Sequence, residues 1–244
     1  MKNSIKNNKK IWDEHYPWVK DGDEWDGQAR YCNVAYDQWK NSLVETLILP
    51  NIPKSGNILE IAPGHGRWSK FLAASQCSLV LVDLSPSCIE FCRNIFTANT
   101  NISYVINDGQ TLEAVADNSI DFIWSYDSFV HMEKGVISCY MGEMFRVLKP
   151  GGKAIIHHPG RNPFFLWLGF TRYWGALGMY FYKIISMNQW SDNDGWRSNV
   201  SKKTMVNLAK KHRLTPVSQF QFWDNTNQIG VPRYNDGITI LQKI

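Results

Sequence analysis

The chain has 244 residues, of which 44% are hydrophobic, 20% charged and 14% aromatic. This length is enough for one well-buried domain and short for two, and the composition excludes disordered, collagen-like and coiled-coil proteins. The five cysteines are an odd number without paired short spacings. They argue against a disulfide framework or a zinc cluster and favour reduced thiols in a cytoplasmic protein.

The formal net charge of +4 arises in the first ten residues, which contain four lysines and no acid. Because the rest of the chain is neutral, this charge indicates a solvated tail rather than a nucleic-acid-binding face. Asp13, Glu14 and His15 follow the tail where a secretory signal would have its apolar stretch. We therefore expect no such signal.

Helical spacing of apolar residues predicts a helix over residues 28–49, which ends before Pro50. From residue 57 onward, short apolar runs alternate with helical stretches, and this alternation predicts an open, doubly wound α/β sheet. Near-continuous apolar runs are typical of parallel strands covered on both faces. The predicted strands cover residues 58–62, 79–82, 102–106, 120–125 and 153–158, and the predicted helices residues 68–74, 86–96 and 136–148.

The alternation ends after the fifth predicted strand. Residues 163–185 form an apolar, aromatic segment, and residues 201–212 are predicted to form a helix with Ser201 as its N-cap. Two further strands are predicted over residues 214–222 and 237–241. The whole chain is therefore expected to be one α/β domain with an N-terminal extension and an insertion before the last helix.

The most informative motif is the decapeptide from Ile58 to Arg67, ILEIAPGHGR. An apolar strand carrying Glu60 leads into a turn with Gly64 and Gly66, and a helix follows. Glycines let the backbone bend sharply and approach a ligand where a Cβ would clash. Ligands of such sheets bind at the carboxyl ends of the strands. The spacing differs from the dinucleotide fingerprint G-x-G-x-x-G, which disfavours NAD.

This motif resembles the first motif of the class I S-adenosylmethionine-dependent methyltransferases, an acid followed by G-x-G-x-G. The chain matches it through Glu60, Gly64 and Gly66, and Ala62 replaces the first glycine. The resemblance covers residues 57–158 closely and implies a seven-stranded Rossmann-like sheet whose last two strands are antiparallel. It also implies S-adenosyl-L-methionine as the cofactor. The expected division is an extension (1–56), a cofactor-binding core (57–158), a lid or substrate insertion (159–200), and a C-terminal helix and strand pair (201–244).

Four further positions fit the family. Asp83 ends the second strand and resembles the acid that accepts hydrogen bonds from the ribose hydroxyls. Asp108, at the end of the third strand, resembles the residue that contacts the adenine amino group, although Asp-Gly is also an ordinary turn signal. Residues 121–125 resemble the strand that lines the sulfonium, and residues 148–153 the turn before the fifth strand. The expected cofactor-binding residues are Glu60, Ile61, Ala62, Gly64, Gly66, Asp83, Leu84, Asp108, Gly109, Gln110, Ser125 and Tyr126. His65 and Arg67 are expected to be surface residues at the start of the helix.

Candidate catalytic residues follow the fourth and fifth strands. Asp127 and His131 follow the fourth strand, and His157 and His158 end the fifth. A neutral imidazole suits the general base for a hydroxyl nucleophile. Only one of the two neighbouring histidines is expected to face the cleft, because strand neighbours point oppositely. The alternatives are that His131 caps a helix or packs beside the cofactor, or that Asp127, His131 and a fifth-strand histidine bind a divalent metal. We expect no metal.

Tryptophans are concentrated outside the predicted core. Only Trp68 and Trp124 of the eleven lie between residues 57 and 158, and the other nine lie in the extension and the C-terminal region. Large amphipathic rings suit stacking on a flat or sugar-like acceptor. The alternative is that they pack these additions onto the core.

The apolar segment 163–185 is long enough to span a bilayer. Arg172 lies in its middle, and the strands on both sides must join one sheet in one compartment, so we expect no transmembrane span. Three roles remain open, in order of preference: a lid over the substrate cleft, a contact in a homodimer, and a shallow membrane-facing helix.

The predicted reaction is transfer of the methyl group of S-adenosylmethionine to an oxygen of a small polar metabolite, a sugar or a glycan end. Nucleic acid is not expected as the acceptor. The fourth strand lacks the Asn/Asp-Pro-Pro-aromatic sequence of amino-methylating DNA enzymes, and no Pro-Cys pair offers a nucleophile for cytosine C5. The alternatives are an N-methyltransferase for a small amine and a cofactor-binding protein without turnover.

Overall fold

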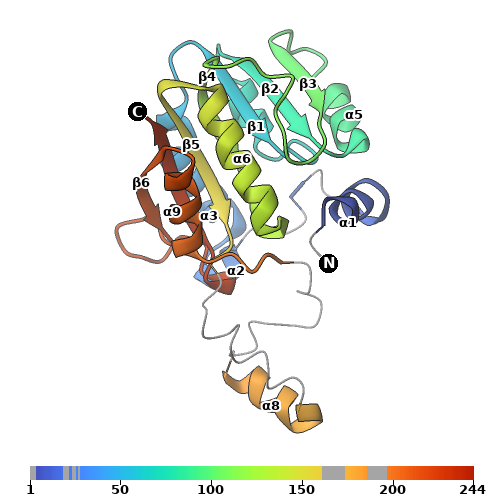
Figure 1. The fold of residues 1–244 in the computed structure, drawn as a ribbon, viewed down its shortest axis with the longest axis vertical. Coiled ribbons are helices and arrows are strands. Elements are labelled where there is room, and N and C mark those ends of the chain that lie inside the picture. The colour runs from blue at the N-terminus through green and yellow to red at the C-terminus, as the bar shows by residue number, and fades with distance from the viewer. Residues whose placement is uncertain (1–3, 19–21, 24–25, 27, 161–173, 186–196) are drawn as a thin grey trace.

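The computed structural model describes residues 4–18, 22–23, 26, 28–160, 174–185 and 197–244. In these residues the chain forms a seven-stranded sheet with the order β3-β2-β1-β4-β5-β7-β6 (Figure 1). Strands β1 to β5 are parallel, whereas β7 is antiparallel to both β5 and β6. This confirms the predicted doubly wound methyltransferase-like sheet. The strands are β1 Asn57–Ile61, β2 Ser78–Asp83, β3 Ile102–Ile106, β4 Ile120–Ser125, β5 Leu148–His158, β6 Leu214–Phe220 and β7 Gly237–Lys243.

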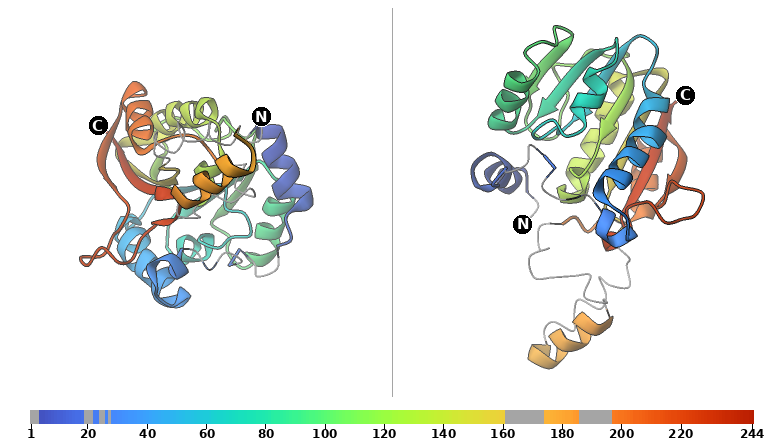
Figure 2. Two further views of the ribbon diagram at one scale, coloured as in Figure 1. Left: turned by 90° about the horizontal axis from the view of Figure 1, so that it is seen from below. Right: turned by 180° about the vertical axis from the view of Figure 1, so that it is seen from behind.

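Hydrophobic layers cover both faces of the sheet. Ile58 of β1 belongs to one layer and Leu59 to the other, and both are fully buried. Helices α6 and α9 pack on the Leu59 face, and α3, α4 and α5 contribute to the layer on the Ile58 face (Figures 1 and 2). Burial of alternate residues on opposite faces is why these strands have continuous apolar sequences.

Helices lie close to where the apolar spacing predicted them. The described α-helices are α1 Ile5–Lys10, α2 Ala29–Cys32, α3 Tyr36–Leu43, α4 Ser69–Ala73, α5 Pro86–Ile95, α6 Lys134–Val147, α8 Gly175–Ile185 and α9 Lys202–Lys211. The predicted single helix over 28–49 is divided. Asn33 takes a left-handed conformation with φ of 55°, which ends α2 before α3 begins. Ser201 is the N-cap of α9, as predicted, and its hydroxyl accepts a hydrogen bond from the Thr204 amide.

Two segments flank the carboxyl ends of the parallel strands. The N-terminal extension places α1 and the π-helical turn Ile11–His15 beside α5. Of the predicted insertion, the structure describes residues 159–160, 174–185 and 197–200, and helix α8 stands apart from the sheet in Figure 1 and in the right-hand view of Figure 2. Within the described residues, no helix has both the length and the apolar character that a membrane span requires.

Candidate active site

A pocket lies at the carboxyl ends of β1, β2 and β4, where the strand order reverses. Its volume is about 870 Å³, including the part open to solvent. Three parts of the chain form it: the loops after β1 and β2, the residues after β4, and the N-terminal extension. The lining residues include Ile5, Asn8, Trp12, Trp18, Ala62, Gly64, Arg67, Asp83, Leu84, Gly109, Tyr126, Asp127 and His131.

The loop after β1 has three residues with left-handed backbone: Ala62 (φ 58°), Gly64 (φ 55°) and Gly66 (φ 76°). Ala62 therefore adopts a left-handed conformation that glycine takes more readily, at a cost of roughly 1–2 kcal/mol. A Cβ on Gly64 would lie 2.8 Å from the Trp18 indole. The glycine at this position is required both by the backbone conformation and by the close approach of the ring.

Glu60 lies beneath this loop and does not line the pocket. Its side chain is 2% exposed and accepts a hydrogen bond from the Ser69 hydroxyl at 2.5 Å. Burial raises the pKa of Glu60 to about 8, so this carboxyl is largely protonated at neutral pH. Ile61 and Ser125 are also behind the pocket wall, where the Ser125 hydroxyl donates to the Ile61 carbonyl at 2.8 Å.

Asp83 lines the pocket at the end of β2. Its carboxylate accepts hydrogen bonds from the backbone amides of Ser85 (2.9 Å) and Gly64 (3.2 Å), and it thereby connects the β1 and β2 loops. Burial raises the pKa of Asp83 to about 6, although these amides favour its ionised form. A buried carboxylate at this edge has the acceptor chemistry that a ribose diol requires.

The Asp108 turn differs from its predicted role. Asp108 Oδ1 accepts hydrogen bonds from the backbone amides of Gln110 (3.0 Å) and Thr111 (2.7 Å), so the residue forms a local turn. Gly109 lines the pocket, but Asp108 and Gln110 do not. The ordinary Asp-Gly turn signal therefore explains this position in the structure.

The N-terminal extension covers the pocket. The lid expected of the insertion falls largely on residues 161–173 and 186–196, which lie outside the described residues. Asp13 Oδ1 accepts hydrogen bonds from the Ser85 hydroxyl (2.7 Å) and the Ser87 amide (3.0 Å) at the start of α5. The Trp18 ring stacks on His65, with centroids 4.2 Å apart and an interplanar angle of 12°. The Asn8 amide donates to the backbone carbonyl of His131 at 2.8 Å. The extension thus contacts three different walls of the pocket.

Asp127 and His131 line the other end of the pocket. Asp127 has a left-handed backbone (φ 60°), and its Oδ2 accepts a hydrogen bond from Arg67 Nη1 at 3.2 Å. The His131 side chain is mostly buried, and its ring lies 5.4 Å from that of Trp12. Arg67 was expected on the surface, but it is 5% exposed and also bonds to the Tyr36 hydroxyl. The expectation was wrong because the helix that begins there faces the extension.

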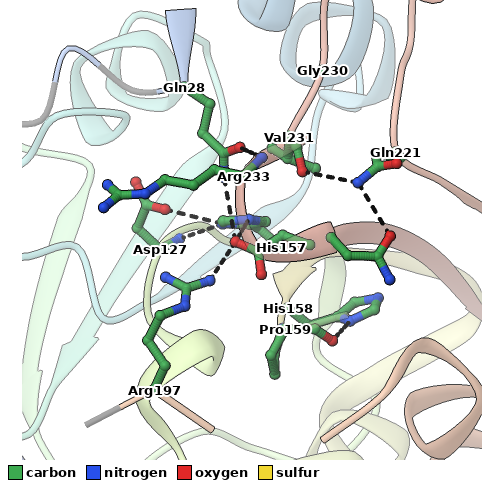
Figure 3. Close-up of polar contacts among 12 residues, drawn as sticks. Gln28, Asp127, His157, His158, Pro159, Arg197, Gln221, Gly230, Val231 and Arg233 are labelled. Carbon is green, nitrogen blue, oxygen red and sulfur yellow. Dashed lines mark hydrogen bonds and ion pairs between the residues drawn. The ribbon is translucent and has the colours of Figure 1, made fainter. Parts of the chain in front are cut away.

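Behind Asp127, basic and acidic side chains alternate in a chain that we call the ion chain: Arg67, Asp127, His157, Asp236 and Arg197. Figure 3 shows Asp127, His157 and Arg197 of this chain. His157 Nδ1 lies 3.1 Å from Asp127 Oδ1, and its Nε2 lies 3.4 Å from Asp236 Oδ2. Arg197 donates a hydrogen bond to the same oxygen of Asp236. Both His157 and Asp236 have fully buried side chains.

Neighbouring side chains in the ion chain shift one another's pKa values. Burial alone would lower the pKa of His157, but the two adjacent carboxylates outweigh burial and raise it. Burial alone would raise the pKa of Asp127, but the hydrogen bond and charge of His157, together with Arg67, lower it to about 2. The pKa of Asp236 is likewise lowered, chiefly by Arg197 and His157 acting against burial. The pocket therefore contains a permanently ionised carboxylate, Asp127.

His158 lies on the opposite side of β5 and outside the pocket. Its ring nitrogens lie 2.7 Å from the Thr239 hydroxyl and 2.8 Å from the Pro159 carbonyl oxygen. Burial lowers the pKa of His158 to about 4. His157 is itself buried. It contacts two pocket-lining residues, Asp127 and Tyr126, and its ring stacks on that of Tyr126 with centroids 4.3 Å apart. Among the residues that the structure describes, no group of three or more His, Cys, Asp or Glu side chains is placed to hold a metal ion.

Asp236, Arg197 and Gln28 were not predicted. The Gln28 amide donates to Asp236 Oδ2 at 3.2 Å, across 208 residues of sequence. No local motif marks such a contact.

Known proteins resemble this chain in its core. A family model described as a methyltransferase domain matches residues 58–152. The chain is 30% identical over 135 residues to a demethylmenaquinone methyltransferase of Clavibacter sepedonicus, which covers 54% of this chain and 53% of that protein. It is 32% identical over 114 residues to a glycine/sarcosine/dimethylglycine N-methyltransferase of Actinopolyspora halophila, with 45% of this chain and 20% of that protein covered. The chain thus spans about half of the first relative and a fifth of the second.

Solved structures share the fold over most of the chain. Geranyl diphosphate C-methyltransferase from Streptomyces coelicolor A3(2) has a TM-score of 0.63 at 12% identity, with 98% of both chains covered. The PH0226 protein from Pyrococcus horikoshii OT3 has a TM-score of 0.61 at 21% identity, with 87% of this chain and 93% of that chain covered. The sheet order and the solved structures show that the chain has the Rossmann-like fold of the class I S-adenosylmethionine-dependent methyltransferases, and residues 58–152 match a methyltransferase domain.

Proposed function

We propose that the protein transfers the methyl group of S-adenosylmethionine to an oxygen of a small polar acceptor, namely a metabolite, a sugar or a glycan end. The observation that carries this proposal is one shared pocket: its cofactor end contains Asp83 and the left-handed loop with Gly64, and its other end contains Asp127 and His131. A cofactor and an acceptor in one pocket meet the geometric requirement of direct methyl transfer. The reduced cysteines support a cytoplasmic location.

The residues at the cofactor end fit the proposed cofactor. The backbone at Gly64, which lines the pocket, provides the close approach, and Asp83 provides acceptors for the ribose hydroxyls. When bound, S-adenosylmethionine supplies an electrophilic methyl group on a sulfonium. The chain's own contribution there is to hold and orient the cofactor, and the Trp12 and Trp18 rings of the extension exclude water from the site.

At the acceptor end of the pocket, Asp127 and His131 have different proposed roles. Because the pKa of Asp127 is lowered to about 2, its carboxylate cannot act as a base near neutral pH and instead accepts a hydrogen bond from the acceptor. His131 lines the same pocket and is the proposed general base that takes the hydroxyl proton at a ring nitrogen. His157 is a positioning residue in this mechanism, since it holds the Asp127 carboxylate from behind.

A second candidate, N-methylation of a small amine, is favoured by one specific observation. The ionised Asp127 stands in a pocket wall that also contains Trp12, Trp18, Trp68 and Tyr126. A carboxylate beside aromatic faces suits a cationic amine, through charge and cation–π attraction. An amine that arrives neutral needs little help from a base, so the two candidates differ in their requirement for His131.

The pH dependence of turnover distinguishes these candidates. Release of S-adenosylhomocysteine would be measured with hydroxyl and amine acceptors, found by mass spectrometry of a cell extract treated with protein and labelled cofactor. For O-methylation, His131→Ala should remove an ionisation near neutrality from kcat/KM, whereas the matched control His212→Ala, which alters a histidine bonded to Ser138, should retain it. An unchanged profile in His131→Ala would contradict O-methylation with this base. No release with any acceptor would favour a protein that binds the cofactor without turnover.

A further inference from the structure

Three arginines alternate with two tyrosines beside the ion chain, in a group that we call the arginine–tyrosine stack: Arg30, Tyr31, Arg233, Tyr234 and Arg197. The guanidinium carbon of Arg233 lies 5.0 Å from the centroid of the Tyr31 ring and 4.4 Å from that of Tyr234. Arg30 lies 4.8 Å from the Tyr31 ring, and Arg197 lies 4.2 Å from the Tyr234 ring. The members come from three segments that are far apart in sequence.

The charges of this stack are not balanced. Arg197 is paired with Asp236. Among the described residues, no carboxylate lies at ion-pair distance from Arg233 or Arg30, and no acceptor takes a hydrogen bond from the side-chain nitrogens of Arg233. Stacking uses the face of a guanidinium, so the N–H groups in its plane stay available to bind an oxyanion through two parallel hydrogen bonds. Arg233 therefore has the donors of an anion site, and the part of the chain that the structure describes gives them no partner.

The turn that carries Arg233 is held in one conformation. Tyr234 and Asn235 both have left-handed backbones, with φ of 58° and 59°, which is unfavourable for residues other than glycine. Contacts on either side fix the turn: the Gln28 side-chain oxygen accepts from the Arg233 amide at 2.7 Å, and the Asn235 side chain donates to the Gly160 carbonyl at 2.6 Å. The Tyr234 ring is 3% exposed. The Arg233 side chain is thus positioned before any ligand arrives.

Polar side chains connect this turn to the acceptor end of the pocket. The side-chain oxygen of Gln28 accepts a hydrogen bond from the Arg233 amide, and its side-chain nitrogen donates to Asp236. Asp236 in turn is joined through His157 to Asp127. In the view of Figure 3, the Arg233 side chain extends to the side of His157 on which Asp127 lies. A continuous series of polar contacts thus joins the turn that carries Arg233 to Asp127 at the acceptor end of the pocket.

We propose that the arginine–tyrosine stack, with Arg233 at its centre, binds a phosphate group of the methyl acceptor. The inference rests on the proposed function, because it names the class of acceptor for the same site. Several guanidinium groups around one turn favour a doubly charged phosphoryl group over a singly charged carboxylate. The acceptor would then carry its phosphate at the stack and its reacting atom beside Asp127 and His131.

Titration with inorganic phosphate tests the inference without any methyl transfer. The nitrogen–proton signals of the arginine Nε groups would be followed by NMR at low ionic strength, with sodium acetate in a parallel arm. We expect saturable phosphate binding by the wild type, and roughly tenfold weaker binding by Arg233→Gln. Arg233→Lys keeps the charge but loses the two-pronged geometry, so it should show an intermediate loss. The matched control is Arg93→Gln, since Arg93 also stacks on a tyrosine, 4.8 Å from the Tyr104 ring.

Binding of S-adenosylhomocysteine by each variant shows whether the fold and the cofactor end are intact. Absence of saturable phosphate binding by the wild type, equal loss in Arg93→Gln, or unchanged binding in both Arg233 variants would overturn the inference. Acetate binding as tight as phosphate binding would also overturn the phosphate assignment. Failure of the proposed function has a different signature: phosphate binding at Arg233 would persist, while no phosphorylated acceptor would become O-methylated.

Discussion

Replacement of His157 by glutamine removes the imidazole that joins the two carboxylates of the ion chain. Asp127 would then keep only Arg67, and Asp236 only Arg197 and Gln28. Removing one partner from a buried charged network typically costs about 3–5 kcal/mol. Because each carboxylate retains one arginine, we expect the lower end, about 3 kcal/mol, which in a domain of this size lowers the melting temperature by roughly 6–12 °C.

The loss of unfolding free energy caused by His157→Gln should become smaller as the pH rises. The folded pKa of His157 is raised above its ordinary value, so its contribution to stability is complete below the unfolded pKa of about 6.5 and is lost as the pH rises through the folded pKa. The pKa of Asp127 is about 2, and this carboxylate stays ionised throughout the range from pH 6 to 9. The difference in unfolding free energy between the wild type and His157→Gln should therefore shrink as the pH rises.

Urea unfolding at several pH values between 6 and 9 measures this difference. His158→Gln is the matched control, because His158 is an equally buried neighbour whose pKa is lowered to about 4. Its difference from the wild type should not change above pH 7. If the His157→Gln difference is constant over the whole range, His157 is neutral in the folded protein and the assignment of alternating charges is wrong.

Four other outcomes are expected. Asp83→Ala should weaken S-adenosylmethionine binding by calorimetry by about 1.5–3 kcal/mol, whereas Asp108→Ala, outside the pocket, should change it less than twofold. Trp18→Ala should speed cofactor release in stopped-flow experiments, because the ring packs over Gly64. EDTA should leave turnover unchanged, and restoration of lost activity by Mg²⁺ would contradict this. Replacement of residues 163–185 by a Gly/Ser linker should raise the acceptor KM and spare cofactor affinity, and unchanged acceptor kinetics in a monomeric variant would instead indicate a dimer contact.

The central sheet was predictable because its determinants are local. Strand β1 is apolar at successive positions since both of its faces are buried, and it leads into a glycine-containing turn whose backbone needs are specific. The start of α5 was equally clear: Pro86 occupies its first turn, and the Ser85 hydroxyl accepts from the Cys88 amide. Such signals lie within a few residues of the feature that they determine.

The ion chain and the pocket cover were not predictable in the same way. Asp127 and Asp236 are joined through His157, and each partner is distant in sequence, so no local pattern contains the cluster. The tryptophans illustrate the same limit. Trp12 and Trp18 line the pocket, but Trp39 has no exposed surface and donates to the Gly230 carbonyl at 2.8 Å, as a core residue. Composition alone cannot separate these two uses of one residue type.

Carboxyl groups at the two ends of the pocket have opposite properties, and the cause is the distribution of cations. At the cofactor end, burial without an adjacent cation raises the pKa of Glu60 to about 8 and that of Asp83 to about 6. At the acceptor end, His157 and Arg67 lower the pKa of Asp127 to about 2. Acidification from pH 7 to 5 therefore protonates Asp83, which loses its charge-assisted bonds to a ribose, and leaves Asp127 ionised. Cofactor binding should weaken in this range while the electrostatic field at the acceptor end is preserved, because the fold supplies fixed cations to only one of the two ends.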